Sequence, residues 1–279
     1  MKLAKATIYF AALALSACQS TKLQPLQRLS LINKGHTISV KIEGYCPVNL
    51  YKDLFAVNAS YQIQNGVIQA DSDADGIPDV KENADLGLNA YSIDSNEDGY
   101  SDLFIQLTGM TLSAQARLPV ALNAGLDSDS DGLWDSDEQI LDTDMLNFDS
   151  DGDEIPDGLE VRFGASAKDN SDAFLSPAGD GLTNLEKIKR NLPLRETATA
   201  ELKALGFQYQ ATTDENGCHH FVVSNISVLS LPTGNQLRFY FIEQKPDGKQ
   251  ALVTRSMFVP GQSEDGAVFT YHFEEGTAG

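Results

Sequence analysis

The chain has 279 residues, with 40 acidic against 20 basic side chains and a formal net charge of −20. Such acidity argues against binding to nucleic acid, whose phosphates require a surface rich in lysine or arginine, and makes cations the natural partners. Hydrophobic residues form 42% of the chain, which suits one or two domains with a core and argues against general disorder.

The N-terminus predicts an export signal. Two lysines among the first five residues precede an apolar run, residues 6–14, that is too short to cross a bilayer as a stable helix. The run ends in Leu15-Ser16-Ala17-Cys18, which resembles the lipobox of bacterial lipoproteins, where cleavage before the cysteine is followed by its acylation, for example with palmitate. The resemblance implies a signal peptide over 1–17, lipid on Cys18 and, from Gln19, the outer membrane at its periplasmic face or at the cell surface. The polar segment that follows, with scattered leucines, suits a tether over 18–35. The alternative is an ordinary signal peptide with a chance cysteine.

Strands are expected at both ends of the mature chain. In the segment 36–70, alternating apolar residues predict a first strand around Val40, and a stretch rich in β-branched and aromatic residues is interrupted by the hairpin signal Asn65-Gly66. A helical pattern over 184–190 ends the acidic region, which spans 71–191. The C-terminal segment 192–279 predicts a helix over 195–205 and then four strands, at 221–231, 236–243, 251–259 and 267–273. We expect these strands to form an antiparallel β-sandwich.

Two cysteines remain once Cys18 is assigned to lipid. Cys46 follows the first expected strand and Cys218 precedes a C-terminal one, and an exported protein folds in an oxidising compartment. We predict a disulfide between them, which would make the acidic region an insertion in one β-domain. The alternatives are two buried thiols or a metal site at Cys218-His219-His220, although three consecutive residues cannot all face one ion.

Four copies of one acidic pattern, D-x-[DN]-x-D with a further acid at the ninth place, lie between residues 71 and 160. This segment holds 24 of the 40 acidic residues and only two basic ones, Lys81 and Arg117. Calcium takes about six to eight oxygen ligands, and a twelve-residue loop supplies them from positions 1, 3, 5, 7, 9 and 12, with a glycine at position 6 for the sharp turn. Position 7 contributes its carbonyl. The pattern therefore predicts calcium-binding loops.

The first and third loops match this pattern at every position. The ligands predicted for the first loop are Asp71, Asp73, Asp75, the carbonyl of Ile77, Asp79 and Glu82. Those predicted for the third loop are Asp127, Asp129, Asp131, the carbonyl of Leu133, Asp135 and Glu138. Gly76 and Gly132 occupy the turn position.

The second and fourth loops each depart from the pattern. The second has Ile105 at position 12, so we expect weaker binding or an oxygen borrowed from a neighbour. The fourth has Glu154 in place of the glycine at position 6, and Gly152 lies two places early, so this loop must bend differently or bear strain at Glu154. The predicted ligands are Asp94, Asn96, Asp98, the carbonyl of Tyr100 and Asp102 in the second loop, and Asp149, Asp151, Asp153, the carbonyl of Ile155, Asp157 and Glu160 in the fourth.

A fifth copy begins at Ser176. It keeps Asp180, the following glycine and Asn184 but has lost the acids at positions 1 and 3. We interpret it as a vestigial loop.

The pattern D-x-D-x-D-G-[IL]-x-D-x-x-E, with Ile77-Pro78-Asp79 and Ile155-Pro156-Asp157, resembles the thrombospondin type 3 repeats of secreted bacterial proteins over about residues 71–190. The fifth copy is similar to dockerin-like variants of the same loop. The resemblance implies loops that lack full flanking helices and wrap around a core of ions. It makes three further residues candidate ligands between the third and fourth loops, the alternative being that they are solvated: Asp137, Asp142 and Asp144.

The chemistry of the ligands favours calcium. Many flexible oxygen ligands suit Ca2+ better than magnesium, and the lack of a histidine or thiolate cluster argues against zinc. We expect about three to four Ca2+ ions, bound at roughly 10⁻⁴ to 10⁻³ M as in other extracellular modules. Crowded carboxylates repel each other without metal, so binding and folding should be coupled.

The sequence thus predicts a mainly β fold: a sandwich-like domain with an inserted, irregular calcium-loop module and short helices. We expect a lipid-anchored envelope or surface protein, rigidified by calcium, with a structural or adhesive role and a protein or glycan partner. No catalytic residue is assigned, because no G-x-S-x-G, H-E-x-x-H or phosphate-loop motif is present. The main alternative is an accessory carbohydrate-binding or hydrolytic surface protein, since two carboxylates suffice for glycoside hydrolysis. A calcium sensor is disfavoured because paired amphipathic helices are not evident.

Overall fold

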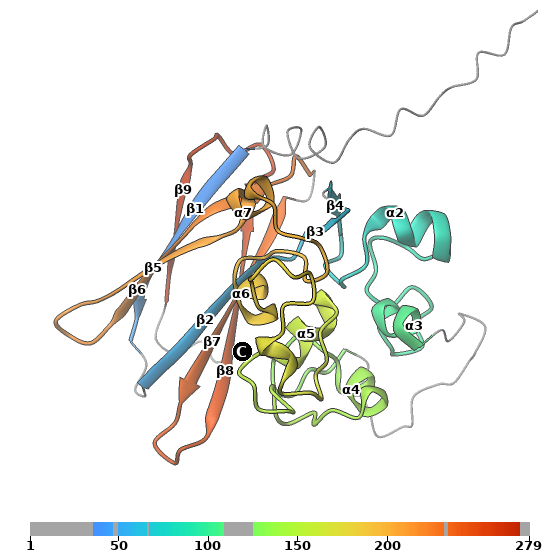
Figure 1. Ribbon diagram of the computed structural model, residues 1–279, viewed down its shortest axis with the longest axis horizontal. Coiled ribbons are helices and arrows are strands. Elements are labelled where there is room, and N and C mark those ends of the chain that lie inside the picture. The colour runs from blue at the N-terminus through green and yellow to red at the C-terminus, as the bar shows by residue number, and fades with distance from the viewer. Residues whose placement is uncertain (1–35, 47–49, 66, 109–124, 232–233, 274–279) are drawn as a thin grey trace, which may run out of the picture.

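The protein is mainly β, with several sheets and short helices (Figure 1). The computed structural model describes residues 36–46, 50–65, 67–108, 125–231 and 234–273, so the predicted signal peptide, Cys18 and the tether lie outside the described residues. The strands form a four-stranded sheet in the order β5-β6-β1-β9, a three-stranded sheet β2-β7-β8 and a hairpin β3-β4. Their bounds are β1 His36–Tyr45, β2 Leu50–Asn58, β3 Tyr61–Gln64, β4 Val67–Ala70, β5 Gln208–Thr213, β6 His219–Val228, β7 Asn235–Gln244, β8 Gln250–Val259 and β9 Val268–His272.

The two larger sheets pack through a conventional apolar core. Side chains of a strand alternate between its faces, and alternate residues of β1, β6, β2 and β7 meet in one buried cluster. The members with almost no exposure include Val40, Val223, Phe239 and Phe241. This cluster forms the interior of the sandwich and requires no metal.

The opposite face of sheet β2-β7-β8 is also buried. Phe55 and Tyr240 point away from the sandwich interior and pack against three residues of the acidic region, Ile155, Leu159 and Ile188. In Figure 1, α5 (Asp157–Phe163) and α6 (Asn184–Lys189) lie beside this sheet. The acidic region is therefore an integral layer of the protein that covers one sheet.

Each acidic loop passes into a short helix that begins at its ninth position. Because positions 7 to 12 carry both ligands and buried apolar residues, the helix fixes the ligand at position 12 against the core. The helices are α2 Asp79–Lys81, continued by the π-helical turn Glu82–Leu86, α3 Asp102–Thr108, α4 Asp135–Leu141, α5 Asp157–Phe163, the 3-10 turn Asp172–Phe174, α6 Asn184–Lys189 and α7 Ala200–Leu205. Among the described residues, no helix has the length and apolar character to cross a membrane.

The disulfide prediction is confirmed. Cys46 and Cys218 are bonded, with their Cα atoms 4.2 Å apart. The bond lies where β1 ends and β6 begins, next to the pair Tyr45 and His219 in the antiparallel register. It closes a segment of 172 residues, which in the chain-entropy view stabilises the fold by about 5 kcal/mol at most.

Three expectations for the strands and helices need correction. The sandwich is not wholly antiparallel, because β9 runs parallel to β1, its neighbour at the edge. Strand β5 was not expected: it is an edge strand whose polar sequence, QYQATT, is mostly exposed and so lacks apolar alternation. The helix expected over 195–205 begins only at Ala200, where the Thr199 side chain caps it by accepting the N–H of Leu202. The hairpin β3-β4 forms as expected, with Gln64 paired to Val67 across Asn65-Gly66.

Candidate metal centres

All four acidic loops share one backbone geometry. The residue at position 6 has a positive φ in every loop, 100° at Gly76, 94° at Gly99, 103° at Gly132 and 79° at Glu154. The aspartate at position 1 accepts the N–H of this residue at 2.8 to 3.1 Å, and the aspartate at position 5 accepts the N–H of position 7 at 2.7 to 3.0 Å. These bonds turn the remaining carboxylate oxygens toward the inside of the loop. The fourth loop bends like the others and bears the strain at Glu154.

Position 4 is a second left-handed position. Its φ is positive in each loop, 66° at Ala74, 56° at Glu97, 68° at Ser130 and 82° at Gly152. Gly152 therefore occupies position 4 of the fourth loop, where every loop adopts the left-handed conformation that glycine favours.

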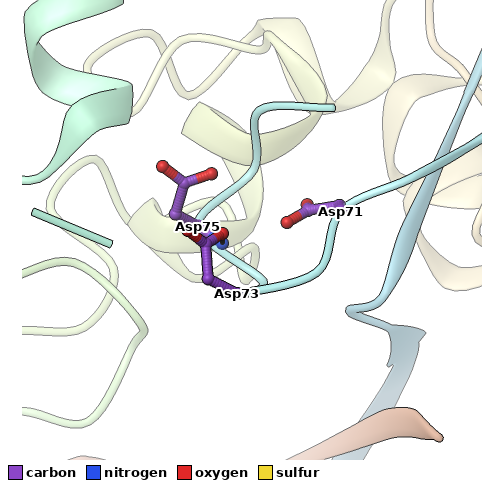
Figure 2. A group of neighbouring side chains, drawn as sticks. All are labelled: Asp71, Asp73 and Asp75. Carbon is purple, nitrogen blue, oxygen red and sulfur yellow. Dashed lines mark hydrogen bonds between the residues drawn. The ribbon is translucent and has the colours of Figure 1, made fainter. Parts of the chain in front are cut away.

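In the first loop, Asp71, Asp73 and Asp75 each place a carboxylate oxygen within 4.8 Å of the others. Figure 2 shows the turn that carries them, with the Asp71 carboxylate directed toward the other two side chains. Asp75 also belongs to a second triad with Glu82 and Asp102, the latter from the second loop. Both oxygens of Glu82 are buried and have no hydrogen-bond partner among the described residues.

The third loop assembles Asp127, Asp129 and Asp131 in the same way. Glu138, at position 12, is fully buried, and its Oε2 has no hydrogen-bond partner within the described part of the chain. Asp157 of the next loop lies close enough to raise the pKa values of both Asp129 and Glu138 electrostatically, after the larger effect of burial.

The fourth loop brings together Asp149, Asp151 and Asp153 and forms a second triad, Asp153, Glu160 and Asp172. Glu160 is fully buried, and neither of its oxygens finds a hydrogen-bond partner among the residues the structure covers. Asp172 belongs to the 3-10 turn after α5 and was not among the predicted ligands. It occupies none of the repeated loop positions, so no signal in the sequence distinguishes it from the other acids.

The second loop is different. In the described chain it contributes no triad of its own, and hydrogen bonds within the protein satisfy its carboxylates. Asp98 accepts the N–H of Tyr100 at 3.0 Å and the side-chain amide of Asn96 at 2.9 Å. Ile105 supplies no oxygen at position 12. The geometry thus separates the second loop from the first, third and fourth.

The aspartates at position 9 have a role that the spacing did not predict. Asp79 and Asp135 each use both carboxylate oxygens to accept hydrogen bonds from one serine at position 2, its N–H and its hydroxyl, at 2.7 to 2.9 Å. Asp102 accepts the same two bonds from Ser95, whereas Asp157 accepts the N–H of Ser150 and its Oδ2 has no hydrogen-bond partner among the described residues. These two also lie near the acidic ligands of the preceding loop. Position 9 therefore closes its own loop, and in two cases it also faces the ligands of another.

Several hydrogen bonds and an ion pair join the loops to one another and to the strands. Asp137 accepts the N–H of Ser101 at 3.1 Å, linking the third loop to the second. Gly158 donates its N–H to Asp131 at 2.9 Å, linking the fourth to the third. The Arg162 guanidinium contacts Asp71 at 3.1 Å and donates to the carbonyls of the β3 region. The loops therefore form one closed unit.

The other two candidates between the third and fourth loops lie outside the clusters. Asp142 is exposed and paired with Lys168, which lowers its pKa chiefly through their hydrogen bond. Asp144 accepts the N–H of Leu146 at 3.2 Å and belongs to no acidic triad in the described residues.

Burial and mutual repulsion make the metal-free carboxylates hard to ionise. Burial first, and then the neighbouring aspartates, raise the pKa of Asp75 to about 9, of Glu82 and Glu138 to about 8 and of Glu160 to about 10. A buried anion is tolerated only with a compensating positive charge. Several buried all-oxygen clusters of this kind could hold a metal ion and are compatible with calcium.

Comparisons with protein-family models, with curated proteins and with solved structures found no match.

Proposed function

We propose that this protein is a calcium-binding component of the bacterial cell envelope, anchored by lipid at Cys18, in which bound calcium holds the layer of acidic loops against the β-sandwich. Its role is structural or adhesive. The observation that carries the calcium assignment is the convergence of buried carboxylate oxygens without partners, above all the four oxygens of Glu82 and Glu160. Such oxygens are costly to bury unless a cation binds them.

Three loops have the donor set that a calcium ion requires. The first, third and fourth loops each combine three aspartates with a buried glutamate at position 12, and a carboxylate from elsewhere in the layer lies beside each set. The donors are carboxylates on flexible loops, which suits the irregular coordination of calcium better than the strict octahedron of magnesium. We infer three calcium sites of higher affinity, in the first, third and fourth loops. The second loop contributes Asp102 to the acidic cluster of the first.

The proposed role follows from where these sites lie. Ile155 and Leu159 flank the ligands of the fourth loop and also pack on the outer face of sheet β2-β7-β8. An ion that orders this loop thereby orders the surface of the sandwich that faces it. A rigid, metal-ordered layer on a lipid-anchored domain suits a protein that holds or contacts another envelope component.

The calcium assignment is tested by the variant Glu160→Gln, with Asp142→Asn as the matched control because both changes remove one carboxylate charge. Glu160→Gln should remove or weaken one calcium-binding event by at least about tenfold in isothermal titration calorimetry, since it removes a buried ligand. Asp142→Asn should bind as the wild type does. Equal titrations for all three proteins would contradict the assignment.

The anchor is tested separately. Cys18→Ala should move the protein from the membrane fraction to the soluble fraction and abolish labelling by a palmitate analogue. Unchanged labelling would contradict the lipid anchor and leave the calcium assignment untouched.

A further inference from the structure

The fifth loop has the backbone of the four acidic loops although most of its acids are lost. Position 4, Gly179, and position 6, Gly181, have positive φ values of 66° and 79°. Asp180, at position 5, accepts the N–H of Leu182, at position 7, at 3.0 Å, as its counterparts do in the other loops. A helix, α6, begins at position 9 as in the others. The loop is therefore a folded repeat.

Position 12 of this repeat is Lys187, where the first, third and fourth loops have the buried glutamate. The Lys187 side chain is fully buried, and its ammonium lies 2.7 Å from Oδ2 of Asp180, which is only 3% exposed. In the first and fourth loops, the corresponding Oδ2 atoms of Asp75 and Asp153 lack a hydrogen-bond partner among the described residues. The cation that these oxygens require is thus supplied in the fifth loop by the chain itself.

The ammonium has a complete set of acceptors. Besides Asp180, it donates to the carbonyls of Leu194 at 3.0 Å and of Glu196 at 2.8 Å, which accounts for its three N–H bonds. Asp180 in turn accepts the N–H of Ala198 at 2.6 Å. The pair therefore ties the loop to residues 194–198, the segment that leads into α7 and the sandwich.

One further substitution fits a loop that binds no metal. The four acidic loops have serine at position 2, whose N–H closes the loop onto position 9. The fifth loop has Pro177 there, which has no N–H to donate. Oδ1 of Asn184 at position 9 lacks a partner in the described residues, but it is a neutral amide oxygen and leaves no buried charge for a cation to balance. Its capping box between Thr183 and Glu186 fixes the start of the helix instead.

We propose that the fifth loop is a metal-independent repeat in which the Lys187 ammonium replaces the ion. Removal of calcium then unfolds the first four loops, and this unfolding ends before residue 176. The segment 176–198 then remains folded on the sandwich. This inference rests on the proposed calcium binding for the response of the first four loops. The stability of the fifth loop without metal does not depend on it.

Hydrogen-deuterium exchange of the full chain, in calcium and in excess chelator, tests this boundary. Peptides covering 180–194 should exchange at the same rate in both conditions, whereas peptides covering 71–82 and 149–160 should exchange at least about tenfold faster in chelator. Equal acceleration of the 180–194 peptides would overturn the proposal. If the exchange rate of no peptide changes with calcium, the proposed calcium binding is wrong. The role of Lys187 in the fifth loop is then tested by the variants below.

Lys187→Met should accelerate exchange at 180–198 by about a hundredfold in both conditions, because it leaves the buried Asp180 charge uncompensated. The double variant Asp180→Asn with Lys187→Met should exchange more slowly than Lys187→Met, since it removes the stranded charge. Lys203→Met, at an exposed position of α7, is the control and should behave as the wild type. A Lys187→Met protein that exchanges like this control would contradict the assignment.

A measurement on the wild type covers the case in which Lys187→Met does not fold. Amine acylation with mass mapping should leave Lys187 unmodified with and without calcium while it labels the exposed Lys203. Labelling of Lys187 that appears only in chelator would show that the fifth loop opens with the others, against the proposal.

Discussion

The sandwich interior and the layer of acidic loops fill space by opposite means. Between the two larger sheets, closely packed aromatic and β-branched side chains remove apolar surface from water. In the loop layer, the first loop contributes only a small apolar cluster around Ile77, and the other buried groups include fully buried carboxylates such as Glu82. We therefore expect the sandwich to keep its stability with or without metal, and the first four acidic loops to depend on bound ions.

The largest expected effect lies in the sandwich and does not depend on calcium. Phe239→Ala should lower the free energy of unfolding by about 3 to 5 kcal/mol, because Phe239 is 1% exposed and its removal leaves a cavity. Denaturant unfolding should show the same loss in calcium and in chelator. Phe258→Ala, on the neighbouring strand at 68% exposure, should change little. A loss at Phe239 that appears only with calcium would mean that the two regions are not independent.

A smaller effect is expected where the third and fourth loops touch. A Cβ on Gly158 would lie 2.4 Å from the carbonyl oxygen of Asp131, so Gly158→Ala must push these loops apart, although alanine normally favours a helix. We expect a loss of about 1 to 3 kcal/mol in calcium, measured by thermal unfolding, together with weaker binding at the third loop. Gln139→Ala, at an exposed position in α4, is the control. Equal stability of the two variants would contradict the close approach of the loops.

The response to pH should have opposite signs with and without metal. Burial and neighbouring acids raise the pKa values of Glu82 and Glu138 to about 8, so the metal-free fold binds more protons than the unfolded chain between about pH 4 and pH 8. Its stability is therefore present at acidic pH and is lost as the pH rises through these values. Calcium competes with the same protons, so its affinity should rise over this range. Thermal unfolding of metal-stripped and calcium-loaded protein at pH 5, 6.5 and 8 measures both trends. A metal-free protein that becomes more stable toward pH 8 would contradict the burial of these carboxylates.

The smallest expected effect is a gain in stability. Glu154 adopts a φ of 79°, which costs a residue with a Cβ about 1 to 2 kcal/mol, while glycine adopts it freely at an entropic cost of about 0.5 to 1 kcal/mol. Glu154→Gly should therefore stabilise the calcium-loaded protein by up to about 1 kcal/mol in thermal unfolding. Glu154→Gln keeps the strained backbone and separates the effect of charge. If glutamine stabilises as much as glycine, electrostatic relief and not the turn explains the gain.

The sequence predicted the repeated loops because their spacing is local. A carboxylate at every second position and a glycine at position 6 describe one turn of chain, so the triad of Asp71, Asp73 and Asp75 follows from the pattern alone. The strands with alternating apolar residues and the disulfide were predicted for similarly simple reasons. The edge strand β5 was not, because an exposed edge carries no such alternation.

The contacts between repeats could not be predicted from that spacing. Asp172 completes a triad with Glu160 only because the chain folds back after α5, and Asp102 reaches the first loop from the second. The same holds for Lys187 in the degenerate fifth repeat, because its role depends on the carbonyls of residues 194 and 196. Contacts of this kind depend on how the loops pack together.

The most direct test of calcium as the support of the loop layer is limited digestion by proteinase K, with the fragments mapped by mass spectrometry. In excess chelator, we expect rapid cleavage within residues 71–108 and 125–160, with the disulfide-linked sandwich and the segment 176–198 left intact. Added calcium should slow cleavage within residues 71–108 and 125–160. Identical digestion of these segments with calcium and with chelator would show that calcium does not support the loop layer.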